Sequence, residues 1–88
     1  TNAEAMRRAG LGAADRGVLL AEYQASGRGR LGRTWTAPPR TQVVVSVLLR
    51  PGSVSPTLFG WLPLVTGLAI RDGLVAAGGV DATLKWPN

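Results

Sequence analysis

Two segments of this 88-residue chain carry side chains that could do chemistry. The longer one is a run in which three glycines and three arginines alternate: Gln24-Ala25-Ser26-Gly27-Arg28-Gly29-Arg30-Leu31-Gly32-Arg33-Thr34-Trp35. Glycine lets a backbone approach a ligand closely, and arginine carries a permanently charged, planar fork that suits carboxylate or phosphate. The alternation therefore predicts a surface loop that closes over a polyanion.

The second segment is Lys85-Trp86-Pro87-Asn88, which follows an apparent strand. A lysine on an apolar strand is uncommon, because burying an ammonium group without a counter-charge is costly. A bound anion would supply that charge, whereas the alternative is that Lys85 points to solvent from the other face. Gln24 stands where a predicted strand meets the loop, and its amide can both donate to and accept from a neutral polar ligand.

The spacing Gly27-x-Gly29-x-x-Gly32 matches a dinucleotide-binding fingerprint only in its letters. That fingerprint needs a helix that begins inside the motif and faces the pyrophosphate. Here Pro38-Pro39 follows shortly after, and no acidic residue stands about 20 positions further on. Two other interpretations of the loop stay open: a solvated basic connector and an RNA-binding Arg-Gly segment, although Trp35 offers little base stacking.

Composition removes several kinds of chemistry from this chain. It has no cysteine and no histidine, so a thiol nucleophile, a Ser-His pair and a His- or Cys-ligated metal are excluded. The net charge is +5, and Lys85 is the only lysine among ten basic residues. This balance favours an anionic partner, which could be nucleic acid, a phosphorylated ligand or anionic lipid.

The elements that must position these groups can be predicted from periodicity and from turn residues. Thr1 and Glu4 fit a capping box at the start of a short helix. The expected order is a helix over 3–9, a strand over 17–24 buried on both faces, a loop over 25–40, a strand over 42–49, a helical segment from Pro56 interrupted at Pro63 and ending at Gly78-Gly79, and a strand over 82–86. This order predicts an α+β domain with a mixed sheet that is incomplete in this chain.

The uncharged stretch between Arg50 and Arg71 is long enough to compare with a membrane span. Its prolines and glycines predict a soluble, buried segment instead. The chain opens at Thr1 without methionine and closes at Asn88 directly after an apparent strand. We therefore expect a fragment of a longer protein.

Taken together, these segments resemble the catalytic domain of biotin protein ligases. The resemblance rests on Thr1-Asn2, on the run from Glu22 to Trp35, on Ser46 and on Lys85-Trp86-Pro87-Asn88. It implies a partial biotin/lipoate ligase-type catalytic domain over 1–88, with a fold like that of class II aminoacyl-tRNA synthetases. It further implies that biotin and ATP, with Mg²⁺, form biotinyl-5′-AMP, and that biotin then passes to a lysine of a biotin carboxyl carrier domain, such as that of acetyl-CoA carboxylase.

The resemblance also implies site residues. It assigns biotin to seven positions: Thr1, Asn2, Gln24, Arg28, Gly29, Arg30 and Lys85. It assigns the nucleotide and its phosphates to a loop made of Gly27, Arg28, Gly29, Arg30, Arg33 and Trp35. Lys85 and Arg30 are the expected catalytic residues, and no metal ligand is assigned.

Some features depart from the family's pattern or leave alternatives open. The family's Pro-x-Gly-x-Asn-Leu approach to the next strand is replaced by Pro38-Pro39-Arg40-Thr41-Gln42-Val43. A lipoate or octanoate ligase or transferase on the same fold is the alternative enzyme, and a basic Gly/Arg nucleic-acid-binding module is the alternative without catalysis. The resemblance implies a cytoplasmic protein that does not enter a membrane. It allows a homodimer, and it allows DNA binding only through a separate N-terminal helix-turn-helix domain. We expect these 88 residues alone to be inactive.

Overall fold

The computed structural model describes residues 1–85, except for the side chain of Arg30. These residues form an α+β chain, which confirms the predicted class. The expected mixed sheet differs: the described strands form two separate two-stranded sheets, and both pairs are antiparallel. The chain divides into two compact units, Thr1–Arg50 and Pro51–Asn88.

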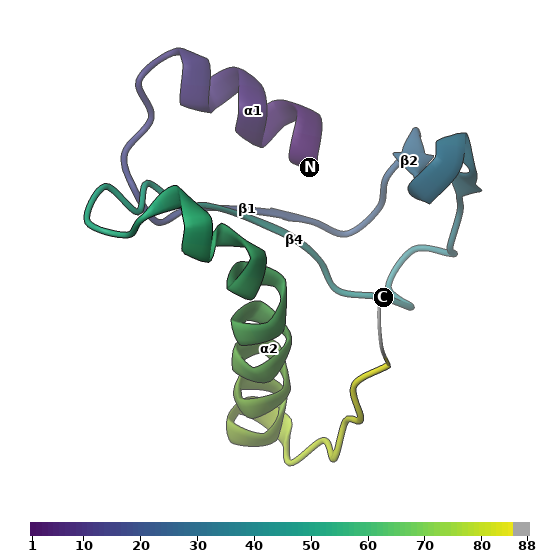
Figure 1. Ribbon diagram of the computed structural model, residues 1–88. Coiled ribbons are helices and arrows are strands. Elements are labelled where there is room, and N and C mark those ends of the chain that lie inside the picture. Colours follow the sequence, from purple (N-terminus) through teal and green to yellow (C-terminus); the bar gives the residue numbers. More distant parts are fainter. Residues whose placement is uncertain (86–88) are drawn as a thin grey trace. The chain divides into compact units, whose positions relative to one another are not determined.

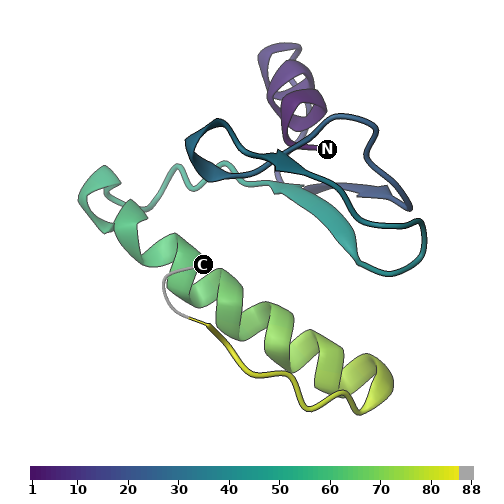
Figure 2. The same cartoon turned by 90° about the vertical axis from the view of Figure 1, so that its right-hand side faces the viewer.

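The first unit is a helix on a two-stranded sheet. Helix α1 (Asn2–Gly10) lies along strands β1 (Gly17–Ala21) and β4 (Val44–Leu48), as Figures 1 and 2 show. The two strands pair antiparallel, with Leu19 opposite Ser46 and Leu20 opposite Val45. The predicted helix over 3–9 and strand over 42–49 are thus confirmed to within two residues at each end.

Burial alternates along both strands, which corrects the expectation that the first strand is buried on both faces. Val44 and Ser46 are buried on the face of β4 that turns to α1, together with Ala5 of the helix. Successive side chains of a strand point to opposite faces. Leu20 and its partner Val45 therefore share the uncovered face, and Leu20 is 74% exposed.

The start of α1 also differs from its prediction. Thr1 is the N-cap residue, but its side chain makes no capping hydrogen bond. Glu4 binds forward instead: Arg7 donates to its carboxylate through Nε and Nη2, both at 2.8 Å, and Nε of Arg8 donates at 2.7 Å. The capping box is wrong because these arginines, three and four residues on, lie on the same helix face as Glu4 and engage its carboxylate.

The two arginines should make Glu4 an unusually strong acid. Their hydrogen bonds lower the pKa of the Glu4 carboxyl from its ordinary value of 4.5 to about 2. The contribution of the Glu4–arginine pairs to the stability of the folded chain is therefore fully present above pH 4.5. It is lost as the pH falls through about 2, where the Glu4 carboxylate takes up a proton. An NMR titration of the Glu4 carboxyl carbon should show the low midpoint, and in the Arg7→Gln/Arg8→Gln variant it should return toward 4.5. A midpoint near 4.5 in the unaltered chain would contradict the pairing.

The Gly/Arg run is more ordered than the predicted loop over 25–40. Strands β2 (Gly27–Arg28) and β3 (Thr34–Trp35) pair antiparallel around a 3₁₀ turn, η1 (Arg30–Gly32). The predicted strand over 17–24 is correspondingly shorter, because β1 ends at Ala21. The sequence did not predict this hairpin, because each of its strands has only two residues, too few to show the alternating pattern of a strand.

The second unit is mostly helical. A 3₁₀ helix, η2 (Pro56–Trp61), leads into α2 (Leu62–Gly78), which confirms the restart predicted at Pro63. The helix ends at Gly79, whose φ of 64° is the left-handed conformation that glycine adopts without steric cost.

The predicted strand over 82–86 is wrong for its described residues, because 82–85 form no strand. The main-chain nitrogen of Ala82 instead donates to the Val80 carbonyl at 3.0 Å, a local turn. A strand requires a paired neighbour, and these residues pair with none of the described strands. Trp86, the last residue of that prediction, lies outside the described residues.

Helix α2 is apolar but exposed. No residue of α2 is buried, although the sequence predicts a buried segment. The helical segment Pro56–Gly78 reaches the length and the mean hydropathy, 1.3, of a membrane span. Those two properties are weak evidence, since a core helix of a soluble protein shares them. Within its own unit, α2 contacts η2, and Leu84 of the following segment lies against Gly67, yet no described residue of the helix becomes buried.

Candidate functional site

The amino end of α1 is fixed to the sheet by a buried hydroxyl. Oγ of Ser46 on β4 lies 2.6 Å from Oγ1 of Thr1 and 2.6 Å from Oδ1 of Asn2. Ser46 is only 6% exposed, so water competes little with these contacts. A hydroxyl carries a single proton, so Ser46 donates to one neighbour at a time and can accept from Thr1 while it donates to Asn2. This cluster holds the first two residues of the chain in one orientation.

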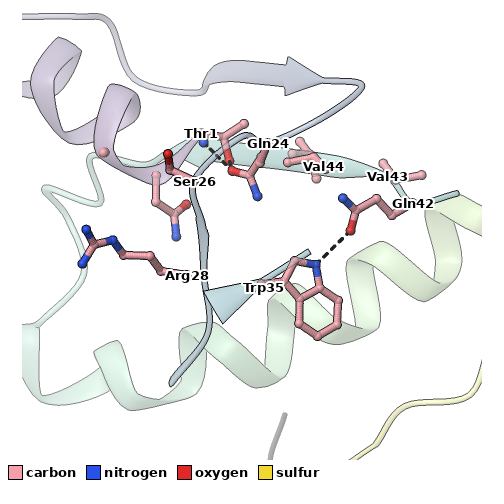
Figure 3. A pocket seen from close by; sticks show the side chains of 11 residues that line it. Thr1, Gln24, Ser26, Arg28, Trp35, Gln42, Val43 and Val44 are labelled. Atoms are coloured by element: carbon pink, nitrogen blue, oxygen red, sulfur yellow. Dashed lines mark hydrogen bonds between the residues drawn. The ribbon is translucent and has the colours of Figure 1, made fainter. Parts of the chain in front are cut away.

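Gln24 joins the same cluster from the segment after β1. Its side-chain oxygen Oε1 accepts a hydrogen bond from the nitrogen of Thr1, here the N-terminal ammonium group, at 2.7 Å. Figure 3 shows the two residues side by side at the wall of a cavity. Oε1 turns to Thr1, and the NH₂ group of Gln24, which is the donor of the amide, is the part that can donate to a ligand.

The hairpin around η1 depends on close backbone approach at Gly27. A Cβ built at this position would clash with the carbonyl oxygen of Trp35 on the paired strand. Beyond it, the main-chain nitrogen of Gly29 donates to the carbonyl of Arg33 at 2.6 Å. Glycine is therefore required at Gly27 by sterics, and the hairpin carries Arg28 and Trp35 on adjacent strands.

A cavity of about 690 Å³ lies between α1, β4 and the hairpin. It is lined by Thr1, Asn2, Ala3, Gln24, Ser26, Arg28, Trp35, Gln42, Val43, Val44 and Val45. Its volume falls within the range typical of small-molecule sites, about 300–1,000 Å³. Polar groups at one wall and valines with Trp35 at another suit a ligand that has one polar end and one apolar part.

The indole of Trp35 is oriented by a second glutamine. Its Nε1 donates to Oε1 of Gln42 at 3.0 Å, and the ring is 56% exposed at the rim of the cavity. Figure 3 shows this pair on one side of the opening and Arg28 on the other, with Gln24 between them. The ring face is thus available to stack on a planar ligand group.

The charge of the site is positive. Among the described residues that line the cavity, Arg28 carries the only ionisable side chain, and none is acidic. A smaller neighbouring cavity of about 310 Å³ shares Arg28 and adds Arg33 and Gly27 to its lining. An anion that spans both cavities would meet two guanidinium groups, each able to bind phosphate or carboxylate in a bidentate manner.

The described residues provide no cage for a metal ion. They hold no group of three or more Asp, Glu, His or Cys side chains placed to bind a cation. The groups that the described residues around the two cavities offer to a ligand are guanidinium, hydroxyl and amide groups.

Several predicted site residues meet at the larger cavity, although α1 ends at Gly10 and the hairpin begins only at Gly27. The residues brought together are Thr1, Asn2, Gln24, Arg28 and Trp35. Lys85 is exposed and belongs to the second unit, so its predicted place beside Arg28 stays a prediction. The side chain of Arg30 lies outside the described part of the structure, and its predicted role stays a prediction as well.

Sequence reasoning missed several contributors to this site, Ala3 at the start of α1 among them. Ser26, Gln42 and the segment Val43–Val45 line the cavity, and no spacing pattern marks Gln42 as the partner of Trp35. Ser46 was singled out only through the family resemblance. A lone hydroxyl on an apolar strand was an available signal, because a buried polar group must find a partner.

Comparison with known proteins defines the class to which this fold and cavity belong. The biotin/lipoate A/B protein ligase family matches residues 10–88, and the chain belongs to this family. The match covers the Gly/Arg hairpin, Gln24 and Ser46, but begins after Thr1 and Asn2.

Individual relatives narrow the likeness to biotin ligases. The chain is 46% identical over its whole length to the biotin–[acetyl-CoA-carboxylase] ligase of Mycobacterium tuberculosis, and 39% identical over its whole length to the enzyme of that name in Paracoccus denitrificans. It is 36% identical over 81% of its length to the bifunctional ligase/repressor BirA of Escherichia coli. The chain spans 35%, 36% and 22% of the length of these three relatives, respectively.

Proposed function

We propose that this chain forms the biotin-binding part of a biotin–[biotin carboxyl carrier protein] ligase. The observation that supports the proposal most directly is the cavity that gathers Thr1, Asn2, Gln24 and Arg28 around one space. The relatives named as biotin ligases, which resemble the chain over its full length, support the same substrate.

The polar wall of the cavity suits the ureido ring of biotin. That ring presents one carbonyl acceptor and two N–H donors. The NH₂ group of Gln24 can donate to the carbonyl, while the hydroxyl of Thr1 and the Oδ1 of Asn2 can accept. The valines of β4 and the preceding segment then cover the apolar part of the ligand. Because Ser46 fixes both acceptors before binding, little side-chain freedom is lost when the ring enters.

Positive charge accounts for the chemical step. A carboxylate oxygen of biotin attacks the α-phosphorus of ATP; the new P–O bond forms, the bond to the bridging oxygen breaks, and pyrophosphate leaves with the electron pair. Carboxylate and triphosphate repel each other, and the guanidinium groups of Arg28 and Arg33 can offset that repulsion. We assign Lys85 and Arg30 to the charge that develops on the α-phosphate, as electrostatic stabilisers.

The second half-reaction requires no nucleophile from this chain. The amine of a carrier lysine attacks the acyl carbon of biotinyl-5′-AMP, and AMP leaves with the bonding pair. The chain has neither cysteine nor histidine, in keeping with a reaction whose nucleophile comes from the partner protein. Closure of the hairpin over the adenylate would keep water from the anhydride.

The remaining features of the proposal concern the intact protein. We propose a fold like that of class II aminoacyl-tRNA synthetases, with Mg²⁺ entering bound to ATP phosphates. The cytoplasm supplies ATP and the carrier domain, and we place the reaction there. The proposal allows the intact protein to form a homodimer. It allows DNA binding, and with it repression of transcription, only if the intact protein has a helix-turn-helix domain in addition to these elements.

Calorimetry with three acids separates this proposal from its alternatives. The intact protein should bind biotin saturably, with affinity that changes little between low and moderate salt, and should bind lipoate and octanoate at least about tenfold more weakly. A preference for lipoate or octanoate would assign the chain to the other branch of the family. Binding to generic DNA or RNA that weakens steeply with salt, without biotin binding, would favour the nucleic-acid module.

A further inference from the structure

Arg50 connects the end of β4 to the far end of α1. Its main-chain nitrogen donates to Oδ1 of Asp15 at 2.6 Å. Its guanidinium donates through Nε to the carbonyl of Ala13 at 2.9 Å and through Nη2 to the carbonyl of Ala9 at 2.8 Å. One residue thus binds three acceptors that lie 35 to 41 positions earlier in the chain.

These contacts add a charged donor at the carboxyl end of α1, where the Ala9 carbonyl also accepts from the main-chain nitrogen of Gly12 at 3.2 Å. The last carbonyls of a helix have no partner within it and carry a partial negative charge. Ala9 is in the last turn of α1, and the guanidinium of Arg50 supplies both a donor and a positive charge there. The side chain of Arg16 in the same connection does not do this: it is 87% exposed and only approaches Asp15, at 3.6 Å.

The other end of α1 carries the cavity wall. The helix has nine residues, which at about 1.5 Å per residue makes a rod of about 14 Å. Thr1 and Asn2 at its start line the cavity, and Ala5 at its middle is buried beside β4. A rod held at its middle and at one end transmits a shift of that end to the other. The orientation of Thr1 and Asn2 therefore depends on what holds the carboxyl end.

We propose that Arg50 is a positioning residue for the binding cavity, which it reaches only through α1. Arg50 does not line the cavity. Its function is to fix the tilt of α1 so that the main-chain nitrogen of Thr1 meets Gln24 and the hydroxyl of Ser46 meets Asn2. The inference rests on the proposed function for the identity of the ligand. The contacts of Arg50 with Ala9, Ala13 and Asp15, which we call the clamp, do not depend on that identity.

Three variants of the intact protein test this role. Arg50→Gln removes the charge and most of the fork, Arg50→Lys keeps the charge with a single donor group, and Arg16→Gln is the matched control because it removes one charge from the same connection. We expect Arg50→Gln to raise the KM for biotin roughly tenfold while kcat at saturating biotin changes less than about twofold. The KM of Arg50→Lys should lie between those of Arg50→Gln and the unaltered protein. The KM of Arg16→Gln should equal that of the unaltered protein.

Two readouts do not require biotin. Hydrogen exchange should accelerate at the amides of the last turn of α1 in Arg50→Gln. The side-chain NH₂ resonances of Gln24 should shift in Arg50→Gln and stay in place in Arg16→Gln. A rise in the KM for biotin without any change in hydrogen exchange or in the Gln24 resonances would overturn the proposal. Faster exchange that leaves the Gln24 resonances and the KM unchanged would overturn it as well.

Failure of the proposed function is recognisable in the same experiment. An unaltered protein that binds no biotin would contradict the ligase proposal, while the exchange and Gln24 measurements would still decide the role of Arg50. If Arg50→Gln does not fold, Arg50→Lys carries the test: Gln24 resonances identical to those of the unaltered protein, with exchange in α1 unchanged, would overturn the clamp.

Discussion

Replacing Lys85 by methionine should abolish biotin activation in the intact protein. We expect pyrophosphate release in the presence of biotin and ATP to fall by about 100- to 1,000-fold, the usual cost of losing one group that stabilises transition-state charge. The physical reason is that the biotin carboxylate and the α-phosphate approach each other as anions. Without the ammonium group, the arginines of the hairpin must offset that repulsion alone.

The fold should survive this change, because Lys85 is exposed in its own unit. Arg71→Met is the matched control: it removes one charge from α2, where Arg71 only approaches Asp72 at 3.9 Å. The control should keep its pyrophosphate release and its circular dichroism spectrum. Release by the Lys85→Met protein within about threefold of the unaltered rate would remove Lys85 from the reaction.

Gly27→Ala should disable the binding cavity for a steric reason. An added methyl group at this position meets the carbonyl oxygen of Trp35, so β2 and β3 cannot keep their present pairing. Arg28 and Trp35 would move with the two strands, and both line the cavity. We expect biotin affinity to fall about a hundredfold, because displacement of binding groups by an ångström is enough for such a loss. Calorimetric titration with biotin measures it.

Two other glycines serve as controls for this variant. Gly10→Ala adds a methyl group at the end of α1 where nothing lies within 4 Å, and it should bind biotin as the unaltered protein does. Gly29→Ala stays within the hairpin and adds only ordinary contacts, 3.5 Å from the Cβ and carbonyl oxygen of Arg33, so β2 and β3 should remain paired. Full biotin affinity in Gly27→Ala would show that the hairpin does not shape the cavity.

The sequence determined the local elements where one physical cue dominated. The β-branched run around Val44–Leu48 predicted a strand, Pro63 predicted the restart of the helix, and Gly79 closes it with a left-handed turn. The alternating glycines and arginines predicted an anion-binding loop, and the motifs together indicated the ligase family that the comparison shows. The local elements depend on neighbours within a few positions, so periodicity and turn chemistry suffice to find them. The family was indicated by resemblance of the motifs to known ligases.

Tertiary structure decided the features that depend on distant partners. Leu20 lies on an uncovered face, and residues 82–85 form no strand because no described strand pairs with them. The cavity itself depends on bonds such as Ser46 to Asn2 and Trp35 to Gln42, and the proposed clamp on Arg50 to Ala9. Hydrogen bonds between residues as far as 44 positions apart leave no spacing pattern in a single sequence, so only folding can reveal them.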